Sequence, residues 1–207
     1  MKIILASDLS FLLKYGYDST GIPKDKMKIG YVTTAGKVAR SQFLDDVKKI
    51  IKENGYSFDE KDIEGKNEQQ LQDFFKDKNV VHLEGGNPFY LLKAIRETNF
   101  AEILKEILDE GKVYIGTSAG AYIMCPTIDV SNWHDETLNR FGVTDFKALN
   151  YVPFVLKVHY QDKSHDFIKE KMKALKYPLR ILRDGQGILV ENGKYTFVGD
   201  GKEVKIS

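Results

Sequence analysis

The segment Val113-Tyr-Ile-Gly-Thr-Ser-Ala-Gly-Ala-Tyr-Ile-Met-Cys125 decides the fold, because an apolar strand runs into small residues and then into a helical pattern. Its centre, Gly116-Thr-Ser-Ala-Gly120, has the G-x-S-x-G form of a nucleophile elbow. Such a bend is sharp and needs neighbours without bulk. A serine there stands at a helix N-terminus, where free N–H groups favour developing negative charge. The segment predicts Ser118 as a nucleophile; the alternative is a turn in which Ser118 only caps the helix.

Short apolar runs alternate with longer amphipathic ones along the whole chain, which predicts a mainly parallel sheet covered by helices. The expected strands are Lys2–Ala6, Lys28–Thr34, Val80–Leu83, Val113–Thr117 and Phe154–Val158. Helical spacing of apolar residues recurs over 43–51, 71–75, 100–108 and 167–175. We expect one α/β domain over residues 1–207.

The C-terminal end has a different pattern. Ile188–Glu191 and Tyr195–Val198 flank Asn192-Gly193, which predicts a hairpin with a tight turn, and 204–206 could add a further strand. The sequence therefore predicts a β-rich C-terminal end.

Composition excludes several classes of function. The chain has 31 basic and 30 acidic residues, and a net charge of +1 favours neither nucleic acid nor an anionic membrane as a partner. No stretch approaches 18 apolar residues, and a single cysteine rules out an internal disulfide. We expect a cytoplasmic protein in which Cys125 is a buried small hydrophobe rather than a reactive thiol.

A second run of small residues, Leu83-Glu-Gly-Gly-Asn-Pro-Phe89, follows another expected strand. Two glycines let the backbone approach a ligand closely with its N–H groups exposed. An oxyanion hole would then pair the N–H of Gly86 with that of Ala119, the residue after the nucleophile. The alternative is an ordinary strand-to-helix turn.

A serine nucleophile needs a base, and the chain has four histidines. His82 lies inside an apolar strand and is expected to pack in the core, while His165 is expected in solvent near a late helix. His159 follows the apolar run 154–156, at the strand end where open α/β sheets build their sites. His159 is the predicted base, and His134 is its competitor.

The third member of a triad is a carboxylate that orients the imidazole. Four carboxylates fall between Ser118 and His159 in the chain: Asp129, Asp135, Glu136 and Asp145. Asp135 and Glu136 lie in the polar stretch 131–137, which suits a loop over the site. The residues themselves leave Asp135 and Glu136 as alternatives for the acid.

Four motifs together resemble the dipeptidase E family, peptidase family S51, which includes cyanophycinase and the α-aspartyl dipeptidases. They are Glu-Gly-Gly-Asn-Pro-Phe-Tyr-Leu-Leu (84–92), Gly-Thr-Ser-Ala-Gly-Ala (116–121), Cys-Pro-Thr-Ile (125–128) and Phe-Lys-Ala-Leu-Asn-Tyr-Val-Pro-Phe (146–154). They occur in the family's order, and the resemblance covers nearly the whole chain.

The resemblance implies a flavodoxin-like three-layer sandwich related to the class I glutamine amidotransferases, with serine in place of their cysteine. It carries the nucleophile to Ser118, the base to His159 and the oxyanion donors to Gly86 and Ala119, and it places Asn87 beside the substrate. It implies a small peptide substrate and no metal or organic cofactor. A homodimer is compatible with it.

The chain departs from the family pattern at two places, which concern the acid and the specificity. The aspartyl dipeptidases have their acid in a Thr-Asn-Asp segment, whereas Asn132 here precedes a tryptophan; Asp135 is the first choice, and Glu136 matches the spacing of a cyanophycinase-like glutamate. The Gly-Glu-Thr-Arg segment of aspartyl-specific members has no counterpart in 160–167, which contains no arginine. We expect a serine peptidase acting on short peptides through an acyl-enzyme, without support for aspartyl preference. The alternatives are an esterase-type hydrolase or a non-catalytic member of the fold.

Overall fold

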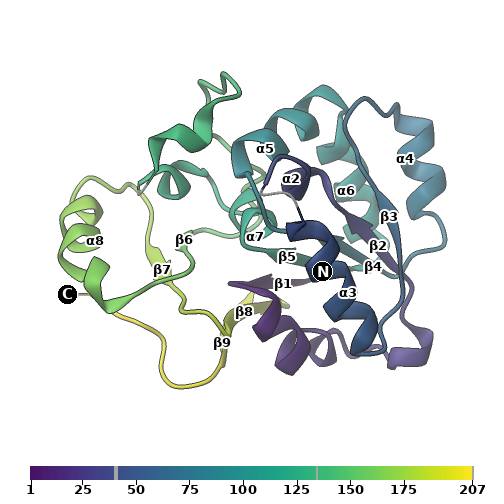
Figure 1. Ribbon diagram of the computed structural model, residues 1–207, viewed down its shortest axis with the longest axis horizontal. Helices are drawn as coiled ribbons and strands as arrows, with labels where there is room; N and C mark the ends of the chain where they lie inside the picture. Colours follow the sequence, from purple (N-terminus) through teal and green to yellow (C-terminus); the bar gives the residue numbers. More distant parts are fainter. Residues whose placement is uncertain (40–41, 134, 207) are drawn as a thin grey trace.

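The computed structural model describes residues 1–39, 42–133 and 135–206, without the side chain of residue 136. Its centre is a seven-stranded sheet in the order β3-β2-β4-β5-β1-β8-β9 (Figure 1). The strands are β1 (Lys2–Ala6), β2 (Ile29–Val32), β3 (Phe58–Lys61), β4 (Val80–Leu83), β5 (Val113–Thr117), β8 (Gln186–Glu191) and β9 (Lys194–Gly199). The first five in the sheet order run parallel, while β8 is antiparallel to β1 and to β9.

Helices cover both faces of this sheet, so the architecture is the predicted three-layer α/β sandwich. One face carries α1 (Leu9–Phe11), the π-helical turn η1 (Leu12–Gly16) and α3 (Phe43–Glu53). The other carries α4 (Glu68–Phe75), α5 (Pro88–Glu97), α6 (Phe100–Asp109) and α7 (Ala119–Ile123). Within β1, Ile3 and Leu5 pack into the second core and Ile4 and Ala6 into the first. A strand buried on both faces explains the continuous apolar run.

The shorter elements are α2 (Thr34–Lys37) and the 3-10 turns η2 (Asp18–Thr20), η3 (Lys24–Lys26), η4 (Asp129–Asn132), η5 (Glu136–Asn139) and η6 (Asp162–Ser164). Asn99 is the N-cap residue of α6, although its backbone is left-handed (φ 54°) and its side chain makes no capping bond. Asn67 and Gln70 form a capping box at the start of α4.

A small lobe stands beside the sandwich (Figure 1). It contains β6 (Val155–Lys157), β7 (Leu179–Ile181) and α8 (His165–Met172). The predicted strand over 154–158 exists, but it pairs in parallel with β7 in a separate two-stranded sheet. The expectation that it extends the main sheet is therefore wrong, and the physical reason is that β8 occupies the free edge of β1.

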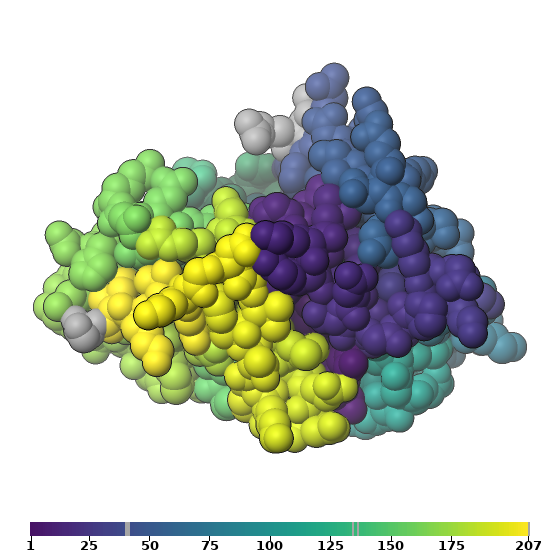
Figure 2. All heavy atoms as spheres, turned by 90° about the horizontal axis from the view of Figure 1, so that it is seen from below, coloured from purple at the N-terminus to yellow at the C-terminus, as the bar shows by residue number. Residues whose placement is uncertain are grey.

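The predicted C-terminal hairpin is confirmed. Asn192 (φ 50°) and Gly193 (φ 73°) make the turn with the two positive φ values that a type I′ hairpin requires. The register pairs Ala6 with Gly187, so β8 begins at the edge of the sheet where β1 ends. Figure 2 shows the C-terminal segment packed directly against the N-terminal one. Val204 adds only an isolated bridge to Ile181.

Candidate active site

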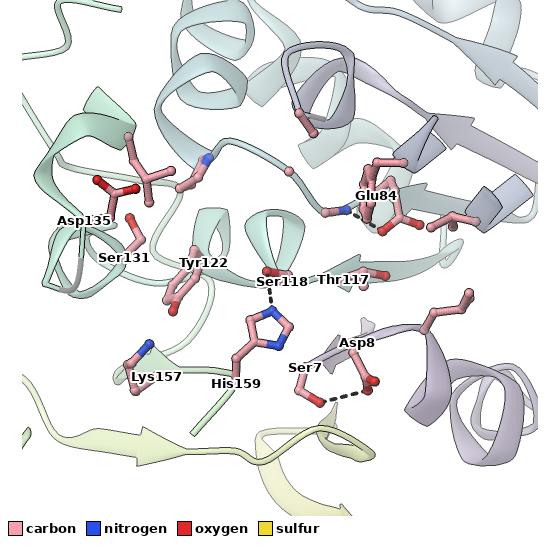
Figure 3. A pocket seen from close by; sticks show the side chains of 18 residues that line it. Ser7, Asp8, Glu84, Thr117, Ser118, Tyr122, Ser131, Asp135, Lys157 and His159 are labelled. Atoms are coloured by element: carbon pink, nitrogen blue, oxygen red, sulfur yellow. Dashed lines mark hydrogen bonds between the residues drawn. The ribbon is translucent and has the colours of Figure 1, made fainter. Parts of the chain in front are cut away.

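A cavity of about 410 Å³ opens where the parallel strands β1, β4 and β5 end, and β6 completes its wall (Figure 3). This is the edge at which open α/β sheets place their ligands. Ser118 and His159 lie at its centre, with Ser7 and Asp8 on one side and Tyr122, Ser131, Asp135 and Lys157 on the other.

Ser118 sits at a sharp bend between β5 and α7. Its φ of 47° and ψ of −99° lie outside the regions that residues with side chains prefer. The Ser118 N–H donates to the carbonyl oxygen of Ala6 at 2.9 Å, which ties the bend to the end of β1. A Cβ on Gly116 would lie 2.5 Å from the carbonyl carbon of Gly120, so the elbow requires glycine at this position.

His159 joins the serine to a carboxylate. Its Nε2 lies 3.0 Å from Ser118 Oγ, and its Nδ1 lies 2.5 Å from Asp184 Oδ1. An ionised carboxylate only accepts hydrogen bonds, so this contact places the ring hydrogen on Nδ1 and leaves Nε2 to accept from the hydroxyl. The structure thus brings together the predicted nucleophile and base, and adds an aspartate that the sequence analysis did not consider.

Asp184 lies in the turn before β8, and a second aspartate anchors that turn. Asp8 Oδ1 accepts the N–H of Gly185 at 2.8 Å and that of Phe11 at 3.2 Å, and Asp8 Oδ2 accepts the Ser10 hydroxyl at 2.6 Å. Burial raises the pKa of Asp8, but these hydrogen bonds together bring its pKa below the ordinary value. The ionised Asp8 therefore holds the turn that presents Asp184.

Among the described side chains, the carboxylate that contacts His159 is not one of the two expected from the sequence. Asp135 lines the cavity, and its Oδ1 accepts hydrogen bonds from the N–H and the hydroxyl of Thr137, at 3.0 and 2.5 Å. The contact with His159 Nδ1 that was expected of Asp135 is made by Asp184. Glu136 begins η5, and its side chain falls outside the described part of the chain, as does the whole of His134. The sequence analysis missed Asp184 because of the sheet topology. Strand β8 runs antiparallel to β1, so the turn before β8, which is distant in sequence, lies at the same edge of the sheet as Ser118.

The two glycines after β4 lie close to Ser118 and to the 34–36 segment. A Cβ on Gly85 would be 3.4 Å from Ser118 Cβ, while Gly86 has φ 137° and a Cβ there would be 2.1 Å from the Ala35 carbonyl oxygen. In the described part of the chain, neither Gly86 N–H nor Ala119 N–H donates a hydrogen bond to a protein group. Both donors are therefore free for a ligand.

Asn87 has a structural environment of its own. Its Oδ1 accepts the N–H groups of Phe89 and Tyr90, both at 3.0 Å, and caps α5. Its Nδ2 donates to the carbonyl oxygen of Leu138 at 2.8 Å. Asn87 is buried and does not line the cavity, in contrast to the place expected from the family resemblance.

A buried polar network lies beneath the elbow. Glu84 accepts the N–H of Gly85 at 2.5 Å and the hydroxyl of Tyr31 at 2.7 Å, and burial raises its pKa. His82 is fully buried, as expected, and burial lowers its pKa to about 3. The neutral ring of His82 contacts the Thr117 hydroxyl through Nε2 at 2.8 Å. The network thus fixes the residues that precede the glycine pair and Ser118.

The sequence analysis did not identify Lys157 as a site residue, because it lies within an apolar run. It ends β6, two residues before His159, and its side chain lines the cavity. Burial lowers its pKa to about 8. A buried lysine in a cavity wall is the other feature of the site that the sequence did not reveal.

Other chemistries have less support in the described residues. Across residues 1–39, 42–133 and 135–206, no group of three or more His, Cys, Asp or Glu side chains is arranged to hold a metal ion. Cys125 is buried, and burial raises its pKa to about 12, as expected of a packed thiol. None of the described helices is both long and apolar enough to cross a membrane.

Comparison with known proteins identifies the family. The model of peptidase family S51 matches residues 19–198. The chain belongs to peptidase family S51. An uncharacterized peptidase of Pasteurella multocida is 30% identical to this S51 chain over 207 residues, covering 97% of it and 99% of the relative. Peptidase E of Nostoc sp. is 30% identical over 134 residues, which cover 64% of this chain and 52% of that protein.

The fold of this S51 peptidase is also found in a solved structure. A candidate peptidase E protein of Listeria monocytogenes EGD-e superposes with a TM-score of 0.82 at 22% sequence identity, covering 97% of this chain and 98% of that one. The predicted family and fold class are thereby confirmed, and the chain is a serine-type peptidase.

Proposed function

We propose that this S51 peptidase hydrolyses short peptides through a Ser118–His159–Asp184 triad and an acyl-enzyme. The observation that carries the proposal is the continuous contact from Ser118 Oγ to His159 Nε2 at 3.0 Å and from His159 Nδ1 to Asp184 Oδ1 at 2.5 Å. Asp184 takes the place that the sequence analysis gave to Asp135 or Glu136.

The reaction follows from the roles of these three groups. His159 Nε2 removes the hydroxyl proton as Ser118 Oγ bonds to the scissile carbonyl carbon. The same proton then passes to the leaving amine, the C–N bond breaks, and an ester remains on Ser118. A water molecule, deprotonated by His159, hydrolyses this ester and regenerates the serine. Asp184 keeps the ring oriented and stabilises its cation in both halves of the reaction.

The oxyanion of each tetrahedral intermediate needs fixed donors. The free N–H groups of Gly86 and Ala119 supply them, because one lies in the glycine pair beside Ser118 and the other starts α7. Removing one such donor in comparable enzymes costs roughly 3 kcal/mol of transition-state stabilisation.

The size of the cavity supports a short substrate. A volume of about 410 Å³ falls in the range of roughly 300–1,000 Å³ typical of small-molecule sites. Such a cavity accommodates a few residues of an extended peptide rather than a loop of a folded protein.

The test is substitution of the nucleophile with a matched control. Ser118→Ala is expected to abolish dipeptide hydrolysis and labelling by a fluorophosphonate probe, with an unchanged circular dichroism spectrum. Ser131→Ala removes another hydroxyl from the same cavity wall and is expected to retain labelling. Peptidase activity that survives Ser118→Ala would refute the proposal.

A further inference from the structure

Lys157 is a buried cation in the wall of the cavity that holds the nucleophile. Only 8% of its surface is exposed. Among the side chains that the structure describes, no carboxylate lies within ion-pair distance of its Nζ, and its one hydrogen bond goes to the carbonyl oxygen of Val158 at 3.1 Å. The ammonium group has three N–H donors, so two have no protein acceptor in that set.

Burial of the charged Lys157 side chain is energetically unfavourable when no ligand is bound. Burying a charged amine away from water is costly unless a counter-charge compensates it, and burial accordingly lowers the pKa of Lys157 to about 8. Among the described side chains on this side of the cavity, the other charged group is Asp135, which has one carboxylate oxygen engaged by Thr137 and is not paired with Lys157. The natural complement to Lys157 is an anionic group of the ligand.

The position of Lys157 indicates which part of a peptide it would meet. His159 gives its proton to the leaving amine, so the leaving residue lies on the His159 side of Ser118. Lys157 precedes His159 by two residues on the same segment, and both side chains line the cavity (Figure 3). In a dipeptide, the leaving residue carries the free α-carboxylate.

We propose that Lys157 binds a carboxylate of the peptide substrate, and that its place beside His159 favours the α-carboxylate of the leaving residue. The inference rests on the proposed function and deepens it, because it makes the enzyme selective for peptides that end one residue after the scissile bond. An acidic side chain is the second source of the same chemistry, and two substrate pairs separate the two sources.

The first pair is Leu-Phe and Leu-Phe amide, which differ only in the C-terminal carboxylate. The second is Asp-Phe amide and Asn-Phe amide, in which the side chain offers the only carboxylate. A hydrogen-bonded charge pair in such a site is expected to give about a 10- to 100-fold preference in kcat/KM. In Lys157→Met that preference is expected to fall to within about threefold of unity.

A collapse of the first ratio in Lys157→Met identifies the α-carboxylate as the ligand group. A collapse of the second ratio supports carboxylate binding with the side chain as its source. Equal ratios in the wild type and Lys157→Met for both pairs overturn the proposal. Lys176→Met, an exposed lysine in the turn before β7, is the matched control and is expected to keep both ratios.

A binding measurement separates this test from the proposed function. Calorimetric titration of Ser118→Ala with Leu-Phe and with its amide reports the carboxylate preference without turnover. Loss of that preference in Ser118→Ala/Lys157→Met supports the role of Lys157 even if the wild type hydrolyses neither peptide. Equal affinity of Ser118→Ala for acid and amide, and for the Asp and Asn peptides, counts against it.

Discussion

Replacing Lys157 with methionine is expected to stabilise the folded protein at pH 7. Methionine matches the length of the aliphatic chain and needs no hydration, so it suits a site that is 8% exposed. Wild-type folding instead has to bury an ammonium group. The enzyme would then retain Lys157 at the expense of stability, as expected of a residue kept for a ligand.

The magnitude follows from the pKa of Lys157. Burial lowers this pKa from 10.5 to about 8. Each pKa unit corresponds to about 1.4 kcal/mol, so keeping the charged form costs the folded state about 3 kcal/mol at pH 7. The variant also loses the hydrogen bond from Lys157 to the Val158 carbonyl oxygen, which lowers its stability by about 1 kcal/mol. The net gain of about 2 kcal/mol corresponds to a rise of about 4–8 °C in Tm for a chain of this size.

The sign of the pH dependence is fixed by the same values. The folded-state pKa lies below the unfolded one, so the wild type gains stability as the pH rises from about 8 to 10.5. Tyr122, Asp135 and His159 also border this part of the cavity, but they are common to both proteins and largely cancel in the difference.

Urea denaturation of the wild type and Lys157→Met at pH 7 and pH 9.5 measures both effects. The advantage of the variant should be largest at pH 7 and should shrink at pH 9.5. A variant that is less stable than the wild type at pH 7, or whose advantage does not change with pH, would refute the reasoning.

Three further predictions concern the triad, the oxyanion loop and the carboxylate site. Asp184→Asn should lower kcat by about 10²- to 10⁴-fold, whereas Asp135→Asn should change it by less than about tenfold; the reverse order would return the acid to Asp135. Gly86→Ala should lower the yield of folded protein or abolish activity, because the new Cβ would meet the Ala35 carbonyl oxygen at 2.1 Å; an active, stable variant would contradict this geometry. The preference for Leu-Phe over its amide should decline as the pH rises through the pKa of Lys157, about 8 in the free enzyme, and a preference independent of pH from 6 to about 10 would argue against that ligand.

The central strands could be predicted to the residue. The structure has Lys2–Ala6, Val80–Leu83 and Val113–Thr117 as the sequence pattern predicts, because strands buried on both faces are apolar at consecutive positions. The edge strand Phe58–Lys61 was missed, since only its ends are partly buried and the residues between them are charged. A strand with one neighbour carries too little apolar pattern to be recognised.

The sequence could single out Ser118 and His159, which the structure brings into contact, because each has a recognisable local sequence context. Ser118 stands between small residues that a sharp bend requires, and His159 follows an apolar run. The contact of Asp184 with His159 has no such mark. The acid was sought between Ser118 and His159 along the chain, but the position of Asp184 depends on which strand pairs with β1. Pairing between distant strands is set by tertiary packing, and one sequence alone does not reveal it.

The antiparallel pairing of β8 with β1 also sets the order in which the site is assembled during synthesis. A ribosome delivers the bend at Ser118 and the imidazole of His159 well before the turn at 183–185, and that turn is held by Asp8 from the first strand-to-helix connection. The proposed triad is completed only when late-made chain returns to the segment made first. In the nascent polypeptide, His159 thus lacks its Asp184 partner until most of this sequence has been translated.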